Sequence, residues 1–237
     1  MKTALNTAKE IARHLVFKMR LRRPKQHVRA GRAETFSTIY SDGTWVHGRD
    51  DVPSSGEGSS LPATTQLRAS LPGLLDRLQA TSVLDIGCGD FTWMQALDLP
   101  CPYVGVDIVG SVIAQNQAQF GSLRRKFIEL DAVTDPLPTA DIVLCREVLF
   151  HLSFADGLAL LRNALATEAR YLIMTTDRGT VFNSDIATGD FRPLNLERAP
   201  FRLPRPIDTI EDSAVADGRL LGIWTADSVS KVLSARG

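Results

Sequence analysis

The sequence predicts an α/β fold, a mostly parallel seven-stranded sheet with helices on both faces and a helical extension at the N-terminus. The first observation behind this prediction is that short apolar runs alternate with helical stretches from residue 82 onward. The second is size and composition: 237 residues, of which 44% are hydrophobic and 23% charged, suit one globular domain with a modest extension.

The first part of the chain is expected to be helical before the sheet begins. Residues 3–20 carry Leu, Ile and Ala at three- and four-residue steps, which is typical of an amphipathic helix, and the Arg-Arg-Pro at 22–24 would end it. A short helix is expected over residues 34–40, followed by a loop over residues 42–60 that is rich in Gly, Ser and Asp. A further helix is expected from residue 62 to about residue 78, where leucines recur on one side.

Strands and helices then alternate along the chain. The expected strands span residues 82–86, 103–106, 127–130, 141–145 and 171–175, and the helices between them span residues 91–97, 111–120 and 154–167. A proline-punctuated segment precedes two last strands at residues 209–211 and 220–225. We therefore expect one domain at residues 33–237, with an N-terminal cap at residues 33–80 and an insert at residues 176–206 that forms a substrate lid.

Charge is unevenly spread along the chain. Residues 1–32 hold ten Lys or Arg and one acid, a net charge of 10 − 1 = +9, so the rest carries −9 because the whole chain is neutral. A domain with this deficit of basic residues is a poor surface for nucleic acid, so we expect no extended contact with it. The basic arm at residues 1–32 could lie weakly on an anionic membrane, pack on the domain itself, or act as a mitochondrial transit peptide.

Cysteine spacing and hydropathy exclude several classes of protein. Cys88, Cys101 and Cys145 lie in or beside apolar runs, and no two are spaced as Cys-x-x-Cys, so neither a disulfide framework nor a zinc site is expected. No cluster of His, Asp and Glu has the spacing of metal ligands, so we expect no metal site. No apolar stretch approaches the roughly 18 residues of a membrane span. These features predict a cytoplasmic protein with reduced thiols.

Acids stand at the ends of three predicted strands. Asp85 ends the first, and Gly87 and Gly89 then let the chain turn tightly against a ligand. Asp107 ends the second strand, 22 residues after Asp85, the separation at which an acid reaches ribose hydroxyls in dinucleotide-binding folds. Asp131 ends the third and is placed to meet an adenine ring. Together they predict an adenosine-containing ligand at the carboxyl edge of a Rossmann-like sheet.

The residues around the glycine turn favour S-adenosylmethionine (SAM) over a nicotinamide dinucleotide. The dinucleotide fingerprint G-x-G-x-x-G needs a third glycine, and position 92 is Thr. Asp85 and Asp90 place carboxylates near the turn, where they would repel a pyrophosphate and attract the ammonium group of SAM.

These motifs carry a resemblance to a known family. Residues 82–175 resemble the class I SAM-dependent methyltransferase superfamily, although Phe91 replaces the third glycine of its D-x-G-x-G-x-G motif. Residues 35–224 resemble a bacterial group of methyltransferases whose substrates are largely unassigned. The shared motifs are Phe36-x-x-Ile39-Tyr40, Trp45, Ser55-Gly56-x-Gly58-Ser59, Cys88-Gly89-Asp90-Phe91-x-Trp93-Met94, Cys145-Arg146-Glu147-Val148-Leu149-x-His151-Leu152-Ser153 and Phe191-Arg192-Pro193-Leu194-Asn195-Leu196. Some members act in surface-polysaccharide biosynthesis, so the resemblance implies a small-molecule or glycan acceptor.

The resemblance also implies which residues bind the cofactor. Asp85, Gly87 and Gly89 would line the methionine part of SAM, Asp107 would bind the ribose hydroxyls, and Asp131 beside Ala132 would bind the adenine amino group. Ser55, Gly56, Gly58 and Ser59 would close over the cofactor with backbone N–H groups facing its carboxylate, unless they form a flexible surface loop. The expected cofactor-binding set also includes Cys88, Ile108 and Arg146.

The expected catalytic residues follow the fourth strand. A hydroxyl acceptor needs a general base, and His151 is the candidate because ligands bind at the carboxyl ends of the strands; the alternative is a structural histidine. Glu147 is either a second base or a salt-bridge partner of Arg146. Substrate contacts are expected from the polar insert, through Asn183, Asp190, Arg192 and Asn195, unless the insert is a plain surface excursion.

Two other functions remain open at this stage. Methylation of RNA or protein is disfavoured by the acidic domain and by the lack of an Asn-Pro-Pro-Tyr-type motif after the fourth strand. A SAM-binding protein without catalysis is disfavoured because Asp85, Asp107 and Asp131 are all present. The favoured prediction is a SAM-dependent methyltransferase that methylates an oxygen of a small molecule or carbohydrate.

Overall fold

The computed structural model describes residues 31–235, so the helix expected over residues 3–20, and the basic arm apart from Gly31 and Arg32, lie outside the described residues. The strands are β1 (Val83–Ile86), β2 (Tyr103–Asp107), β3 (Arg125–Glu129), β4 (Ile142–Cys145), β5 (Tyr171–Asp177), β6 (Asp208–Glu211) and β7 (Arg219–Thr225). The helices are α2 (Arg32–Ser41), α3 (Thr65–Arg77), α4 (Gly110–Phe120), α5 (Phe154–Leu165) and α6 (Ala226–Ser234).

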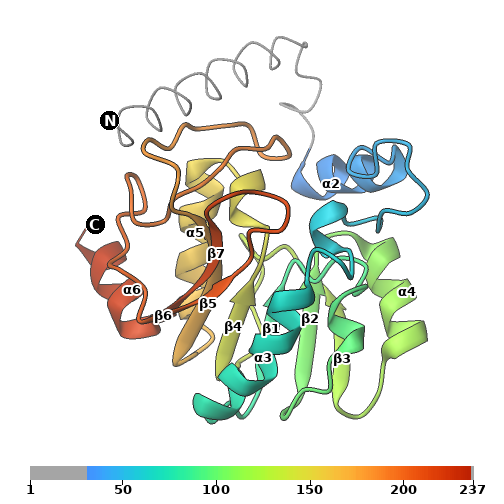
Figure 1. The fold of residues 1–237 in the computed structure, drawn as a ribbon, viewed down its shortest axis with the longest axis horizontal. Coiled ribbons are helices and arrows are strands. Elements are labelled where there is room, and N and C mark those ends of the chain that lie inside the picture. The colour runs from blue at the N-terminus through green and yellow to red at the C-terminus, as the bar shows by residue number, and fades with distance from the viewer. Residues whose placement is uncertain (1–30, 236–237) are drawn as a thin grey trace.

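The strands form one sheet in the order β3-β2-β1-β4-β5-β7-β6 (Figure 1). The first five are parallel, and β7 runs antiparallel to both β5 and β6. The predicted seven-stranded, mostly parallel sheet is confirmed.

Helices cover both faces of the sheet because neighbouring strand residues point to opposite sides. Leu84 and Val143 face the side where α5 and α6 pack. Val83 and Ile142 face the side where the leucines of α3 pack. β1 and β4 are buried along their whole length, as expected of central strands covered on both faces.

The prediction of a helix over residues 91–97 is wrong. Only one turn of 3-10 helix, Met94–Ala96, forms there. Phe91 has a φ of 60°, which is incompatible with a right-handed helix, and the carboxylate of Asp90 accepts the N–H of Thr92. Pro100 also disfavours a helical conformation at Leu99. The apolar side chains of this segment pack directly into the core instead.

The edge strand β3 and the last helix differ from the expected elements in smaller ways. β3 begins two residues before the expected strand and ends one residue before it, because an edge strand tolerates exposed side chains that do not alternate. Helix α6 was not expected. It begins where Thr225 caps the N–H of Ser228, and it buries Val229 and Leu233, four residues apart on one side.

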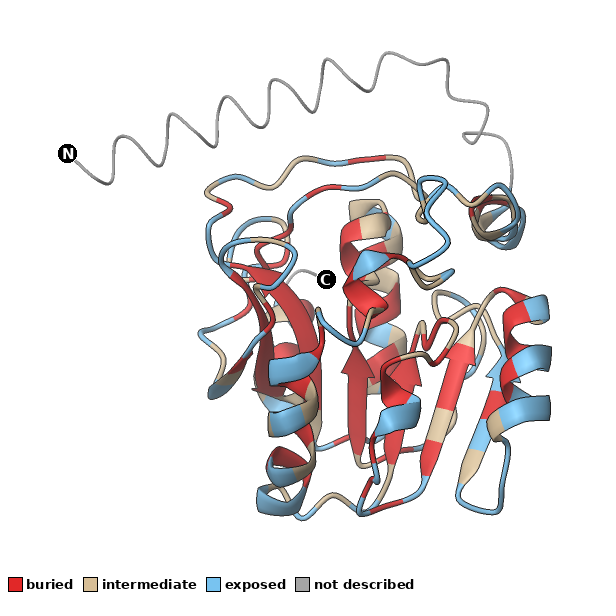
Figure 2. Ribbon diagram, turned by 45° about the vertical axis from the view of Figure 1, so that its right-hand side comes forward, coloured by how far each residue is buried: buried red, intermediate tan, exposed pale blue. Residues whose placement is uncertain are grey.

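Two segments lie over the carboxyl edge of the parallel strands. One is α2 with the loop that follows it, and the other is the insert between β5 and β6 (Figure 1). Figure 2 shows the buried strands with both segments beyond their arrowheads. This edge is where open α/β sheets bind ligands.

Candidate active site

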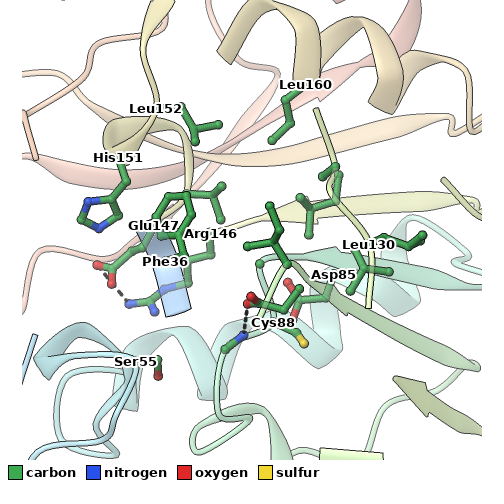
Figure 3. Close-up of a pocket in the computed structure, with 18 of the residues that line it drawn as sticks. Phe36, Ser55, Asp85, Cys88, Leu130, Arg146, Glu147, His151, Leu152 and Leu160 are labelled. Atoms are coloured by element: carbon green, nitrogen blue, oxygen red, sulfur yellow. Dashed lines mark hydrogen bonds and ion pairs between the residues drawn. The ribbon is translucent and has the colours of Figure 1, made fainter. Parts of the chain in front are cut away.

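A pocket opens at the carboxyl edge of the sheet, beneath α2. Its free space, part of it open to solvent, is about 960 Å³. Thirteen of the expected cofactor and catalytic residues line it: Ser55, Ser59, Asp85, Gly87, Cys88, Gly89, Asp107, Ile108, Asp131, Ala132, Arg146, Glu147 and His151. In Figure 3, Arg146, Glu147 and His151 lie together on one side of the pocket, and Asp85, Cys88 and Leu130 on the other.

The turn after β1 requires glycine. Gly87 has a φ of 70°, and a Cβ atom there would lie 2.4 Å from Cγ2 of Val148. The N–H of Gly89 donates to a carboxylate oxygen of Asp107 at 3.1 Å. The turn is therefore pressed against the segment after β4 and tied to the end of β2, with its backbone exposed to the pocket.

Asp85 is a buried carboxyl group at the pocket wall. The hydroxyl of Tyr103 donates to it at 2.7 Å. Burial raises the pKa of Asp85 from 3.8 to about 7, although the Tyr103 hydrogen bond and the charge of Arg146 oppose the rise. A cationic ligand group next to Asp85 would stabilise its charged form.

Asp107 and Asp131 are both already engaged with the protein. Asp107 also accepts the N–H of Val109 at 3.0 Å, and burial raises the pKa of its carboxyl group. Asp131 accepts the N–H of Val133 at 3.0 Å and pairs with Arg32 of α2 at 2.8 Å. Arg32 was not expected to take part in the site, and it links α2 to the strand end predicted to meet adenine.

The Ser-Gly loop before α3 is held by hydrogen bonds. The backbone N–H and the hydroxyl of Ser55 both donate to the carboxylate of Asp90, at 3.1 and 2.8 Å. The N–H groups of Gly56 and Ser59 donate to carbonyl oxygens within the loop. Three of the four N–H groups expected to face the cofactor carboxylate are thus engaged elsewhere, and neither Gly56 nor Gly58 lines the pocket.

Arg146 is braced by a carboxylate that comes from the far end of the chain. Its Nε and Nη2 atoms donate to both oxygens of Asp212 at 3.0 and 2.9 Å, and Nη2 also donates to the carbonyl oxygen of Gly58 at 2.9 Å. Arg146 and Asp212 are both buried. Arg146 therefore joins the end of β4, the Ser-Gly loop and the β6–β7 connection.

Glu147 has a different main partner from the one expected. Its carboxylate accepts from Nη1 of Arg219 at 2.6 Å, whereas Arg146 is 3.7 Å away. Its φ of 59° is unusual for a side chain of this size, and Thr175 holds its N–H through a 2.8 Å hydrogen bond. The strained backbone directs the carboxylate against the Ser-Gly loop, where a Cβ at Gly58 would lie 2.0 Å from Oε2.

His151 is held as a neutral hydrogen-bond acceptor. Its Nδ1 atom lies 3.0 Å from the carbonyl oxygen of Asp190. A carbonyl only accepts, so Nδ1 carries the proton and Nε2 keeps a lone pair. Burial lowers the pKa of His151 to about 4, and the charges of Arg219 and Arg192 act in the same direction. The imidazole is therefore neutral at physiological pH.

The insert residues expected to bind substrate do not reach the pocket. Asn183 donates to the carbonyl oxygen of Asn195 at 2.8 Å, and the N–H of Asn195 donates back to Asn183 at 2.9 Å. Arg192 is buried and donates to the carbonyl oxygen of Leu152 at 2.6 Å. Asp190 contributes its carbonyl oxygen to His151. Arg192 and the backbone of Asp190 hold the insert against the segment after β4, whereas Asn183 and Asn195 bond within the insert. None of the four lines the pocket.

Several residues that complete the site were not among the expected site residues. Phe36, Tyr40 and Trp45 line the pocket from α2 and the loop after it. These three residues belong to two of the motifs shared with the bacterial methyltransferases, and the motifs were the only indication in the sequence of a role in the site. Asp212 and Arg219 carry no motif, and their partners lie 66 and 72 residues away in sequence.

The pocket fits a cofactor that carries both a cation and adenosine. Asp85, with its pKa near 7, suits the ammonium group of SAM. Asp107 stands where ribose hydroxyls are expected, and Leu130 and Val133 add apolar wall beside Asp131. Among residues 31–235, no three His, Cys, Asp or Glu side chains converge as metal ligands would, and no helix is long and apolar enough to cross a membrane.

Comparison with known proteins gives one family and one fold. A family model described as a methyltransferase domain matches residues 61–237. No protein of curated function matches.

Several solved structures resemble this one. The methyltransferase domain of the bacterial protein CtHen1 has a TM-score of 0.51 and 16% identity, over 69% of this chain and 99% of that one. PigF with S-adenosylhomocysteine (SAH) has a TM-score of 0.51 and 16% identity, over 68% of this chain and 55% of that one. The SAM-dependent methyltransferase SibL has a TM-score of 0.50 and 19% identity, over 68% of this chain and 55% of that one. At these identities the likeness shows the fold.

The family match covers α3, the whole sheet and the segment after β4, and so includes most of the pocket. The chain therefore belongs to the methyltransferase domain family, and S-adenosylmethionine is the cofactor that this class I fold uses.

Proposed function

We propose that this protein methylates an oxygen atom of a small-molecule or carbohydrate acceptor, with His151 as the general base and without a metal ion. SAM supplies the methyl group, already activated by its positive sulfur. The observation that carries the proposal is the state of His151, which lines the pocket as a neutral imidazole with its Nδ1 proton directed to Asp190. Such an imidazole can accept the proton of an acceptor hydroxyl at Nε2.

The other residues orient the reactants in this proposal. Asp85, Cys88, Gly89, Asp107 and Ile108 hold the methionine and ribose parts of the cofactor, and Asp131 with Ala132 holds the adenine. Glu147 binds the acceptor beside His151, and Arg146 fixes the Ser-Gly loop over the cofactor. Asn183, Asp190, Arg192 and Asn195 act indirectly. Asp190 and Arg192 hold the insert against the segment of His151, and Asn183 and Asn195 brace the insert internally. The acidic domain supports an acceptor other than extended nucleic acid, and three free, buried cysteines support a cytoplasmic location.

The proposal is tested by His151→Ala, with Phe182→Ala as the matched control. We expect turnover to fall about 10²–10⁴-fold, as loss of a general base predicts, while the affinity for SAM measured by titration calorimetry stays within about twofold. Phe182 is 71% exposed and does not line the pocket, so its variant should behave as the parent protein. Normal turnover of His151→Ala at neutral pH would make His151 a structural residue, and binding of NAD in place of SAM would refute the cofactor assignment.

A further inference from the structure

Aromatic rings wall the part of the pocket around His151. The ring of Trp45 lies 5.0 Å from that of His151, and the two ring planes are tilted by 33°. Tyr40 meets Trp45 edge-on at 5.3 Å, and Phe36 lies 6.2 Å from it. All four side chains line the pocket. This wall offers flat apolar faces, which suit a ring more than a flexible chain.

The polar groups on this wall are neutral donors and acceptors, together with one carboxylate. Nε2 of His151 and the carboxylate of Glu147 accept hydrogen bonds, and the Tyr40 hydroxyl and the indole N–H of Trp45 can donate them. The two buried cations nearby are already paired, Arg219 with Glu147 and Arg146 with Asp212. A carboxylate or phosphate near the reacting atom would therefore meet acceptors without a matching cation. The wall suits a neutral acceptor that carries one or two hydroxyl groups.

The small number of polar atoms discriminates between kinds of ring. A sugar ring carries several hydroxyl groups, and each one buried without a partner weakens binding. Few polar groups stand on this wall, namely those of His151, Glu147, Tyr40 and Trp45, and the rest of it is apolar surface from the aromatic rings and Val148. An aromatic ring with one hydroxyl group leaves no polar group unpaired there.

The basicity of His151 also favours an acidic hydroxyl. The pKa of this imidazole is about 4. A phenolic hydroxyl has a pKa near 10, whereas that of water is about 15.7 and aliphatic alcohols are similarly weak acids. General-base catalysis becomes more effective as the gap between base and acid narrows. A weak base is therefore better matched to a phenol than to a sugar hydroxyl.

We propose that the acceptor is a planar aromatic ring with a hydroxyl group on the ring, bound against Trp45 with its hydroxyl donating to Nε2 of His151. This inference rests on the proposed function and restricts the chemical class of the methyl acceptor. The oxygen of the hydroxyl group forms a bond to the methyl carbon of SAM. The bond from that carbon to sulfur breaks and leaves its electron pair on sulfur. The hydroxyl proton passes to Nε2. The products are an aryl methyl ether and SAH.

Binding of matched probes to the protein saturated with SAH tests the ring and the hydroxyl separately. The probes are 2-naphthol, its saturated counterpart decahydro-2-naphthol, 2-methoxynaphthalene, which has no hydroxyl to donate, and methyl glucoside. By titration calorimetry, we expect 2-naphthol to bind at least about tenfold more tightly than each of the others. With SAM in place of SAH, 2-naphthol should be converted to 2-methoxynaphthalene at least about tenfold faster than either alcohol is methylated.

Variants of Trp45 separate a role in binding the acceptor from a role in folding. Trp45→Ala should weaken 2-naphthol binding at least about tenfold, and Trp45→Phe should restore most of it because the ring face is kept. The affinity for SAH should stay within about twofold in both variants, and Phe182→Ala should match the parent protein. Equal binding of all four probes, or preference for methyl glucoside, overturns the inference about the acceptor. If the protein still binds SAM in that case, the proposed function stands. A protein that binds neither SAM nor SAH refutes the proposed function itself.

Discussion

At the scale of single residues, Asp85 illustrates how the site is arranged for a ligand. Only 3% of its surface is exposed, and its pKa is raised to about 7 by burial. In the unfolded chain the carboxyl group would titrate near 3.8. Between these two values the folded protein binds the proton more tightly than the unfolded chain does. The charged form of Asp85 therefore destabilises the fold, fully above pH 7 and not at all below about pH 4.

We expect Asp85→Asn to stabilise the protein and to weaken SAM binding. Asparagine keeps an oxygen that can accept from Tyr103 and removes the buried charge. A shift of about three pKa units sets a ceiling of about 4 kcal/mol on the gain at pH 8. Thermal unfolding without ligand should show a higher Tm for the variant at pH 8 and a much smaller difference near pH 4. A lower Tm at pH 8 would contradict the argument.

The same carboxyl group predicts how SAM binding depends on pH. Because the ammonium group of SAM favours charged Asp85, the affinity should fall as the pH drops below about 7, approaching tenfold per pH unit. Titration calorimetry at pH 6 and pH 8 measures this directly. Asp85→Asn is the control, and its weaker affinity should change little over that range. The same pH dependence in parent and variant would mean that a group other than Asp85 binds the proton that weakens SAM binding.

At the scale of elements, the sequence was informative where one local pattern decides the structure. The apolar runs of β1, β4 and β5 and the leucine stripe of α3 marked those elements close to their observed ends. The glycine turn and the acids at or near the ends of β1, β2 and β3 were predicted site residues, and they line the pocket. The pattern failed at residues 91–97, where every third or fourth residue is apolar but the positive φ of Phe91 prevents a helix.

We expect Gly58→Ala to disturb the contact between the Ser-Gly loop and Glu147, on the acceptor side of the pocket. Its new Cβ would lie 2.0 Å from Oε2 of Glu147, so either the loop or the Glu147–Arg219 ion pair must move. Overpacking of this kind costs about 1–3 kcal/mol. Turnover should fall at least about tenfold, and the Tm should fall as well.

Gly73→Ala is the matched control for this substitution. Gly73 lies inside α3, where a Cβ would approach only the end of the Arg77 side chain, at 4.0 Å. Alanine in a helix interior stabilises by about 0.5–1 kcal/mol relative to glycine, so the Tm should rise slightly and turnover should not change. Equal behaviour of the two variants would mean that Gly58 has no special role.

At the scale of the whole molecule, the site is assembled from distant parts of the chain. Arg32 reaches Asp131, 99 residues away, and Gly58 is joined to Arg146, 88 residues away. Asp212 and Arg219 bring the antiparallel end of the sheet to the same place. Sequence spacing cannot reveal such pairs, because each depends on the strand order and on how the loops cross the carboxyl edge. The sequence marked His151 and Glu147 on the acceptor side, but the ion pairs that brace this side became visible only in the structure.

The segregation of charge along the chain leads to the last prediction, which concerns the basic arm. The full-length protein should bind weakly to vesicles that contain phosphatidylserine, because each basic residue near such a surface contributes about 1 kcal/mol. The shortened chain should begin at Gly31 rather than at Ala33, since Arg32 pairs with both Asp131 and Asp156. Starting at Ala33 would disturb α2 and the pocket together with the arm.

Co-sedimentation should then show binding by the full chain and none by the chain that begins at Gly31. Uncharged phosphatidylcholine vesicles and raised salt should both abolish the binding, since the attraction is electrostatic. The affinity of the two chains for SAM should agree within about twofold. Vesicle binding by both chains, or by neither, would rule out the arm as a membrane anchor. A loss of SAM affinity on shortening would show instead that the arm packs on the domain and helps to close the pocket.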